Sequence, residues 1–296
     1  MAQIILVTLP IGNLQDITQR ALEALKSSGP FLAEDTRNLK KLFQLYDIST
    51  EGKTLLAYHD HDRSAIDKAM SFLKAGKDVY LVSDAGSPMI SDPGYPLVME
   101  ALSCGFKMTT LPGASAVVSA LELSGLPPHP FVFHGFSPRD DKKRERLFEE
   151  CWEQTLAREQ ASLTHIIYES PHRMDKTLKA LAKSDKSYSD RVINVALARE
   201  LTKKFETVYR FRAQDYLDPE SSLHEIIQIK GECVLVFHMS LTENAQRSVM
   251  ASAEWKKIES MAKECLDSKG HPKNVSKLLA QILSIAPKEA YNLMKR

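Results

Sequence analysis

The chain has 296 residues, of which 43% are hydrophobic and 26% charged, and its formal net charge is +1. This composition is that of an ordinary globular protein long enough for two domains, and the balanced charge leaves nucleic-acid affinity to local basic patches. The four cysteines are scattered and form no C-x-x-C pair, which argues against a disulfide framework and a structural zinc site. No apolar run approaches the roughly 20 residues of a membrane helix. The chain enters a strand-like run at once, without a signal-peptide pattern, so we expect a cytoplasmic protein.

The first part of the chain alternates between short apolar strands and amphipathic helices. The hydrophobic pattern predicts strands at 4–8, 31–34, 79–82 and 108–111. Three helices are predicted. The first follows Asp16, which is expected to be its N-terminal cap. The second covers 62–75 and should end at Gly76, and the third begins at Pro96 and should end at Gly105. This alternation is typical of a mostly parallel sheet covered by helices.

The second part begins at a predicted hinge, Pro112-Gly113, followed by a helix at 115–123 that ends before Gly125. Further strands are expected at 131–134, 165–168, 192–198, 207–211 and 233–238, and helices at 142–158 and 172–183. Because several of these strands follow one another without a helix, the second sheet should be mixed. Beyond Ser240 the composition favours helices. We therefore expect α/β domains at 1–112 and 113–240 and a small helical appendage at 241–296.

Two loops rich in Gly and Pro follow strands of the first part and are the first candidates for a ligand site. In an open α/β sheet, ligands bind at the carboxyl ends of the strands. In the first loop, Pro10 fixes a backbone dihedral and Gly12 allows the backbone to approach a ligand closely. The second loop, at 83–94, offers the Asp84 carboxylate, hydroxyl groups and a glycine turn. The alternative is that both loops are tight turns whose polar side chains cap the next helix.

Several familiar site motifs do not occur in the sequence. It contains neither G-x-G-x-x-G nor G-x-x-x-x-G-K-[ST], which disfavours a standard dinucleotide site and a P-loop nucleotide hydrolase. It also contains neither G-x-S-x-G nor H-E-x-x-H, the signals of an α/β-hydrolase and of a zinc protease. If the two loops bind a ligand, they do so through a different motif from these four.

Six segments, taken together, resemble a known family. They are 6–18, 33–37, 83–95, 111–116, 168–173 and 198–202. In order and spacing they resemble the tetrapyrrole-methylase superfamily, and within it the branch that methylates the ribose 2′-hydroxyl of a cytidine in 16S ribosomal RNA. The resemblance covers about residues 4–238, and the tail at 273–294 resembles the small helical part of the family more weakly. Leu9 stands where Thr or Ser is usual, and Asp60 where Glu is usual.

The resemblance implies two α/β domains of the class III methyltransferase type, with S-adenosylmethionine bound in the cleft between them, no metal, and a homodimer. Carried over position by position, it implies that the cofactor contacts Pro10, Gly12, Asp84, Gly86, Ser87, Ser115, Ala116, Tyr168 and Ala198. Methyl transfer is an in-line displacement at a sulfonium carbon. Catalysis should therefore consist mostly of positioning and desolvation.

A ribose hydroxyl is a weak nucleophile and needs a base or a hydrogen-bond acceptor. Among the ionisable groups of the matching segments we favour Glu34 or Asp35, with His61 as the competing base. Glu169 and Glu200 each lie beside an arginine in sequence, so an ion pair is the simpler interpretation of both carboxylates.

Basic side chains supply the phosphate contacts by which proteins hold RNA. The candidates for this role are Arg37, Lys40, Lys41, Arg139, Lys142, Lys143, Arg144 and Arg173. The alternative for the run at 139–146 is a solvated helix face, because Asp140, Asp141 and Glu145 dilute its charge. Tyr58 and the two histidines that follow it could stack on an extruded base, or could belong to a packed loop.

The leading hypothesis is an enzyme that uses S-adenosylmethionine to methylate a cytidine ribose 2′-hydroxyl, either in 16S ribosomal RNA or in the small ribosomal subunit. One alternative is methylation of a tetrapyrrole ring carbon, which shares the fold. Another is a non-catalytic RNA-binding assembly factor. The basic cluster and the basic tail favour a polyanionic substrate over a tetrapyrrole.

Overall fold

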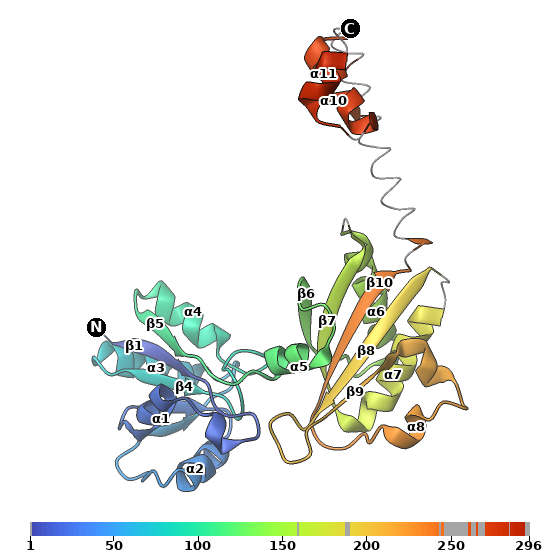
Figure 1. The fold of residues 1–296 in the computed structure, drawn as a ribbon. Coiled ribbons are helices and arrows are strands. Elements are labelled where there is room, and N and C mark those ends of the chain that lie inside the picture. The colour runs from blue at the N-terminus through green and yellow to red at the C-terminus, as the bar shows by residue number, and fades with distance from the viewer. Residues whose placement is uncertain are drawn as a thin grey trace.

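The strands of the described residues form two five-stranded sheets, one in each part of the chain (Figure 1). The structure is a computed structural model. It describes residues 2–158, 160–186, 190–242, 244–245, 260–261, 265, 270–283 and 285–293. The division of the strands between two sheets accords with the predicted α/β fold class. The domain limits 1–112, 113–240 and 241–296 remain our proposal.

The first sheet is entirely parallel, in the order β3-β2-β4-β1-β5. Its strands are β1 (Gln3–Val7), β2 (Phe31–Ala33), β3 (Leu55–Ala57), β4 (Val79–Val82) and β5 (Lys107–Leu111). Its helices are α1 (Gln19–Lys26), α2 (Thr36–Leu45), α3 (Arg63–Lys74) and α4 (Tyr95–Ser103), with a 3-10 turn η1 at Leu14–Asp16. Apolar side chains of α3 and α4 pack on one face and those of α1 and α2 on the other. Because the strands are parallel, the loops after β1, β4 and β5 meet at one edge.

Most predicted helix starts lie within one residue of the observed ones, and two of the differences concern the residues that begin the helix. Thr18, not Asp16, caps α1, since its hydroxyl accepts a hydrogen bond from the Ala21 N–H at 3.3 Å. Asp16 lies in η1 instead. Helix α4 begins at Tyr95, so Pro96 occupies its second position, where its missing N–H costs no hydrogen bond.

Helix α2 and strand β3 had no counterpart in the sequence prediction. Strand β3 has only three residues, at the edge of the sheet, and is too short to show a period. Helix α2 does carry a pattern, because Leu39, Leu42 and Phe43 recur at helical spacing and pack on the sheet. The sequence prediction overlooked it.

The second sheet is mixed, as predicted, in the order β6-β7-β10-β8-β9. Its strands are β6 (Phe131–Phe136), β7 (Ser162–Glu169), β8 (Arg191–Arg199), β9 (Thr207–Arg212) and β10 (Cys233–Leu241). Strands β6 and β7 are parallel, whereas the other neighbours are antiparallel. The helical segments are α5 (Ala116–Ser124), α6 (Asp141–Leu156), α7 (Pro171–Lys186), η2 (Ala213–Leu217) and α8 (Leu223–Ile226).

Helix α5 links the two halves and covers one face of the second sheet (Figure 1). Ser115, predicted as the first helical residue, instead caps its start, and Gly125, in the left-handed conformation, ends it, as the sequence predicted. Its buried residues Val117, Ala120 and Leu121 pack on the sheet, while α6 and α7 cover the opposite face. The helix thereby brings the loop after β5 to the second sheet.

Near the C-terminus, α10 (Pro272–Leu283) and α11 (Pro287–Leu293) pack against each other. Both are helical, as expected, whereas much of the predicted appendage at 241–296 lies outside the described residues. Within the described ranges, no helix has the length and apolar character needed to cross a membrane.

The loop before α4 gives a test of the fold. Gly94 has φ 151°, and a Cβ there would lie 2.7 Å from Met89 Cγ and 2.8 Å from Leu81 Cδ2. We expect Gly94→Ala to lower the free energy of unfolding by about 1–3 kcal/mol. Gly76→Ala is the matched control, because Gly76 also has positive φ but faces open space, and it should cost only about 1 kcal/mol. Urea unfolding measures both, and equal losses would contradict the crowding argument.

Candidate functional site

The two Gly- and Pro-rich loops are joined by backbone hydrogen bonds. The Leu9 N–H donates to Gly86 O at 2.9 Å, and the Gly86 N–H donates to Leu9 O at 3.1 Å. Gly86 has φ +71°, and the Ser83 hydroxyl donates to the carbonyls of Ala85 and Gly86 at 3.1 and 3.0 Å. The loops after β1 and β4 therefore form one unit at the carboxyl edge of the first sheet.

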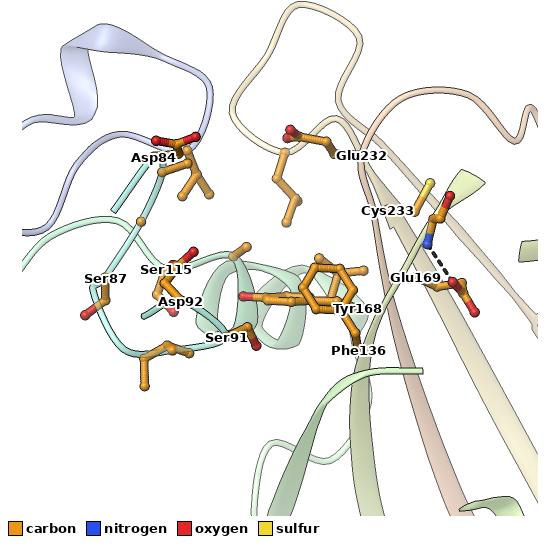
Figure 2. Close-up of a pocket in the computed structure, with 18 of the residues that line it drawn as sticks. Asp84, Ser87, Ser91, Asp92, Ser115, Phe136, Tyr168, Glu169, Glu232 and Cys233 are labelled. Carbon is orange, nitrogen blue, oxygen red and sulfur yellow. Dashed lines mark hydrogen bonds between the residues drawn. The ribbon is translucent and has the colours of Figure 1, made fainter. Parts of the chain in front are cut away.

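A cavity of about 390 Å³ lies between this unit and the second sheet (Figure 2). Its volume is within the range of small-molecule sites. It is lined by Ile11, Asp84, Ala85, Gly86, Ser87, Ile90, Ser91, Asp92, Ser115, Ala116, Phe136, Tyr168, Glu169, Ser170, Pro171, Leu201, Glu232, Cys233 and Val234. The site thus draws on loops of the first sheet, the start of α5 and strands of the second sheet.

The side of the cavity formed by the first half is polar. The Asp84 carboxylate accepts a hydrogen bond from the Asn38 side chain of α2 at 2.8 Å, which fixes its orientation. Ser115 lies at the N-terminal end of α5, where free backbone N–H groups attract negative charge. In Figure 2, Asp84, Asp92 and Ser115 lie across the cavity from the aromatic rings.

The opposite side is aromatic and apolar. The rings of Phe136 and Tyr168 pack edge to face with centroids 5.3 Å apart, and Phe136 remains 62% exposed. Behind them the buried Glu169 carboxylate accepts hydrogen bonds from the Ser170 N–H and the Thr177 hydroxyl, both at 2.6 Å, and pairs with Arg173 at 2.6 Å. The predicted ion pair between Glu169 and Arg173 is therefore present in the structure.

Asp92 is the main electrostatic feature that the sequence analysis missed. Desolvation, reinforced by the charges of Glu34 and Asp84, raises the pKa of its carboxyl to about 6. Burial and the Asp92 charge in turn raise the pKa of the Tyr168 hydroxyl to about 12. The sequence could have indicated Asp92, because it lies in the loop after β4, within the Ser-Asp-Pro-Gly run. Loops at the carboxyl ends of parallel strands are where functional carboxylates come together.

Six of the predicted cofactor-contacting residues line the cavity: Asp84, Gly86, Ser87, Ser115, Ala116 and Tyr168. The other three do not. Pro10 is buried, and Ala198 lies in the apolar cluster against which Tyr168 packs. Gly12 has a different reason to be glycine, because a Cβ there would lie 2.6 Å from Lys203 Cγ, on a loop of the second sheet.

The structure does not bring Glu34, Asp35 or His61 into the lining of the cavity. Glu34 and His61 are exposed, although the charge of Glu34 acts on Asp92. Asp35 caps α2, and both its oxygens accept hydrogen bonds from Arg37, which lowers its pKa to about 2. A carboxyl held this way is a poor proton acceptor, so Asp35 is a weak candidate for the base.

Of the predicted RNA contacts, Lys40 and Lys41 on α2 and Lys142 and Lys143 on α6 are exposed, as are Arg37 and Arg139. Arg144 is not available, because its side chain is 2% exposed and pairs with Asp141 at 2.8 Å. Its guanidinium also donates to the carbonyls of Pro138 and Arg139, so Arg144 holds the start of α6. The prediction that it contacts RNA is wrong.

Three further predictions need correction. Arg173, predicted to contact RNA, forms an ion pair with Glu169, and only 23% of its side chain is exposed. Tyr58 is 1% exposed and donates its hydroxyl hydrogen to Asp60, so it cannot stack on a base. Asp60 also accepts a hydrogen bond from the Gly94 N–H at 2.8 Å and ties the loop after β3 to the start of α4. Glu200 pairs with Lys203, not with the neighbouring Arg199.

Comparison with known proteins bears on the family and the fold. A sequence profile of the tetrapyrrole (corrin/porphyrin) methylases matches residues 3–216. The ribosomal RNA small subunit methyltransferase I of Bacillus subtilis (strain 168) is 40% identical over 250 residues, which are 82% of this chain and 77% of that protein. The protein of the same name from Streptococcus pyogenes serotype M1 is 36% identical over 287 residues, 97% of this chain and 92% of that protein.

Two solved structures share the fold at low sequence identity. Diphthine synthase superposes with a TM-score of 0.55 at 16% identity, covering 85% of this chain and 95% of its own. The methyltransferase CobJ superposes with a TM-score of 0.54 at 18% identity, covering 80% of this chain and 94% of its own. The fold is therefore shared with these structures.

The raised pKa of Asp92 predicts a pH-dependent effect on stability. Its carboxyl holds a proton more tightly in the folded protein than in the unfolded chain, so stability contributed by this group is lost as the pH rises from about 4 to about 6. We expect Asp92→Asn to raise the free energy of unfolding at pH 8 by about 1 kcal/mol, after allowance for partial exposure, or Tm by about 2–4 °C. At pH 4 the gain should vanish. Thermal unfolding at both pH values checks this, and an equal gain at both would refute it.

Proposed function

The chain belongs to the tetrapyrrole (corrin/porphyrin) methylases, in the group of the ribosomal RNA small subunit methyltransferases I, and from this premise we propose how it works as a methyltransferase of small-subunit ribosomal RNA. The methyl donor is S-adenosylmethionine, bound in the cavity between the two sheets. The acceptor is the ribose 2′-hydroxyl of a cytidine in 16S ribosomal RNA. With such a substrate the site of action is the cytoplasm.

The observation that carries the proposal is the division of the cavity into an acidic side and an aromatic side. S-adenosylmethionine has a cationic sulfonium and ammonium, an anionic carboxylate, a ribose diol and an adenine ring. The start of α5 at Ser115 suits the carboxylate, and Asp84 suits the ammonium or the ribose diol. Phe136 and Tyr168 offer ring faces to the adenine or the sulfonium. The charged groups of the donor thus find partners within one cavity.

The acceptor hydroxyl needs a group that takes its proton. Asp92 lies in the cavity lining, and its pKa of about 6 lies close to the working pH, where general bases are most effective. We therefore assign the base to Asp92 and keep Glu34, whose charge raises that pKa, as the second candidate. The rest of the rate enhancement comes from holding donor and acceptor in line.

Exposed basic residues flank the cavity from both halves of the chain. Helix α2 carries Arg37, Lys40 and Lys41 and reaches the cavity through the Asn38–Asp84 hydrogen bond. On the other side, the segment from Phe136 to the start of α6 leads directly to the exposed basic side chains at 139–143. Cations on both sides of a site suit a polyanion that spans it. This placement favours RNA over a tetrapyrrole, and the donor-binding cavity disfavours a non-catalytic assembly factor.

The decisive experiment is methyl transfer from labelled S-adenosylmethionine. The acceptors are free 16S RNA and small subunits from cells that lack the gene, compared with a uroporphyrinoid. We expect label in the RNA and, after nuclease digestion and mass analysis, a 2′-O-methylated cytidine. Label in the porphyrinoid alone would overturn the assignment. Absence of both transfer and donor binding in calorimetry would favour the assembly factor.

Variants in the same assay separate the roles of the side chains. Ser115→Trp should fill the cavity and abolish donor binding, whereas Ser71→Trp on the exposed face of α3 should not. Asp92→Asn should keep donor binding and lower kcat by about 100-fold or more. Lys142→Ala with Lys143→Ala should raise KM for RNA and flatten its salt dependence without changing kcat.

We also propose that the protein is a homodimer, with α4 and β5 as the contact surface. Tyr95, Met99 and Leu102 form an exposed apolar stripe along one side of α4, and Met108 of the edge strand β5 is exposed beside it. Apolar groups gathered in this way commonly mark an interface. We expect sedimentation to give twice the chain mass, and Met99→Glu with Leu102→Glu to give the monomer. Leu45→Glu is the control, because Leu45 is an exposed apolar residue of α2, outside this surface. A monomeric unmodified protein would contradict the proposal.

A further inference from the structure

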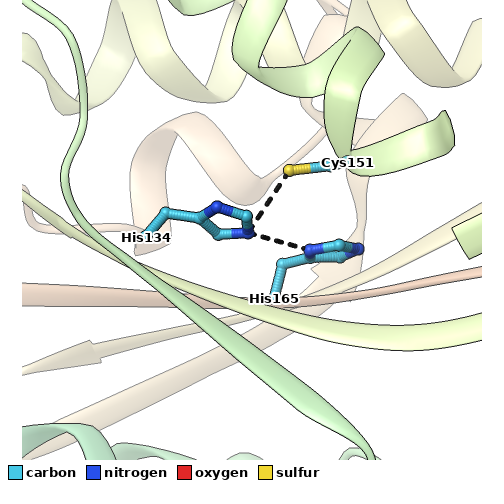
Figure 3. A group of neighbouring side chains, drawn as sticks. All are labelled: His134, Cys151 and His165. Atoms are coloured by element: carbon cyan, nitrogen blue, oxygen red, sulfur yellow. Dashed lines mark hydrogen bonds between the residues drawn. The ribbon is translucent and has the colours of Figure 1, made fainter. Parts of the chain in front are cut away.

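A second cluster of reactive side chains lies on the far side of the second sheet from α5. His134 comes from β6, Cys151 from α6 and His165 from β7, three consecutive elements of the chain (Figure 3). His165 and Cys151 are fully buried, and His134 is half-buried. None of the three lines the cofactor cavity, so the methyl-transfer chemistry does not use them.

The three donor atoms converge on one point. His134 Nε2 lies 3.0 Å from His165 Nδ1 and 3.6 Å from Cys151 Sγ, and all three atoms lie within 4.8 Å of one another. Around a tetrahedral zinc ion, with Zn–N of about 2.0 Å and Zn–S of about 2.3 Å, such atoms are roughly 3.3–3.6 Å apart. The two histidine nitrogens would have to move a few tenths of an ångström apart, and the Cys151 side chain would have to turn toward the midpoint of the cluster, to reach this geometry.

Thr155 sets the tautomer of His165. The Thr155 hydroxyl donates its one hydrogen to the Cys151 carbonyl at 2.8 Å, so at 3.0 Å from His165 Nε2 it must accept. His165 therefore carries its hydrogen on Nε2 and presents a lone pair on Nδ1 to His134. Metal-binding histidines are held in this way by a partner of the other ring nitrogen.

From this geometry we propose that His134 Nε2, Cys151 Sγ and His165 Nδ1 bind one zinc ion, with the fourth position open to water beside the half-buried His134. Two imidazoles and a thiolate are a donor set for zinc, whereas calcium and magnesium require oxygen ligands. Binding releases the thiol proton to solvent and moves the His134 hydrogen to Nδ1.

The three ligands come from β6, α6 and β7, so the site joins three elements of the second half of the chain. A bound ion would fasten α6 to β6 and β7. Since β6 ends at Phe136, it would also fix the strand that carries one aromatic wall of the cofactor cavity.

The test is metal binding by the full-length protein after removal of metal with a chelator. We expect one zinc per chain in competition with a chromogenic chelator, and a zinc-dependent rise in Tm. Cobalt(II) in place of zinc should give a thiolate-to-metal charge-transfer band. Failure to bind stoichiometric zinc, or cobalt binding without that band, would overturn the site and leave the cluster as a neutral hydrogen-bonded chain.

Variants assign the ligands. Cys151→Ser should abolish the band and weaken zinc binding by more than about 100-fold, while Cys104→Ser, at an exposed cysteine outside the cluster, should change neither. Thr155→Val should weaken binding by about 10–100-fold with the band retained. If Cys151→Ser does not fold, His134→Ala decides, because His134 is half-buried and its loss should be tolerated. Zinc affinity unchanged in His134→Ala would overturn the proposal.

Discussion

The structure of the site depends on the pair of backbone hydrogen bonds between Leu9 and Gly86. Two loops that belong to different strands become a single rigid edge, because each residue satisfies both polar groups of the other. Asp84 and Asp92 are carried on one of these loops, and Ile11 on the other lines the same cavity. The left-handed conformation of Gly86 is what lets the second loop turn toward the first.

The second half of the chain completes the site through the antiparallel part of its sheet. Strand β7 ends where β10 begins, so Tyr168 and Val234 are paired neighbours that face the cavity together. Helix α5 serves both halves, since its first residues border the cavity and its apolar side packs on the second sheet. Gly12 adds a direct contact between the halves at Lys203. The site therefore requires both sheets and cannot be assembled by either alone.

The sequence predicted those features that local chemistry determines. The parallel first sheet, the mixed second sheet and the end of α5 at Gly125 follow from periodicity and turn residues, and the loops after β1 and β4 were identified from Gly and Pro. Contacts between distant segments could not be found in this way. Asn38 reaches Asp84 across 46 positions, and Arg144 looks like a surface charge until its carbonyl partners are seen. The cluster at His134, Cys151 and His165 has no short metal-binding spacing, because its members come from three elements.

The acidic side of the cavity has a consequence for turnover. Desolvation, together with the charges of Glu34 and Asp84, disfavours the ionised form of Asp92. Under the proposed function, a cationic sulfonium donor would offset part of this cost on entering, and it becomes a neutral thioether once its methyl group has left. The same carboxylates would then hold the spent cofactor less strongly than the fresh one, which would favour exchange of product for substrate.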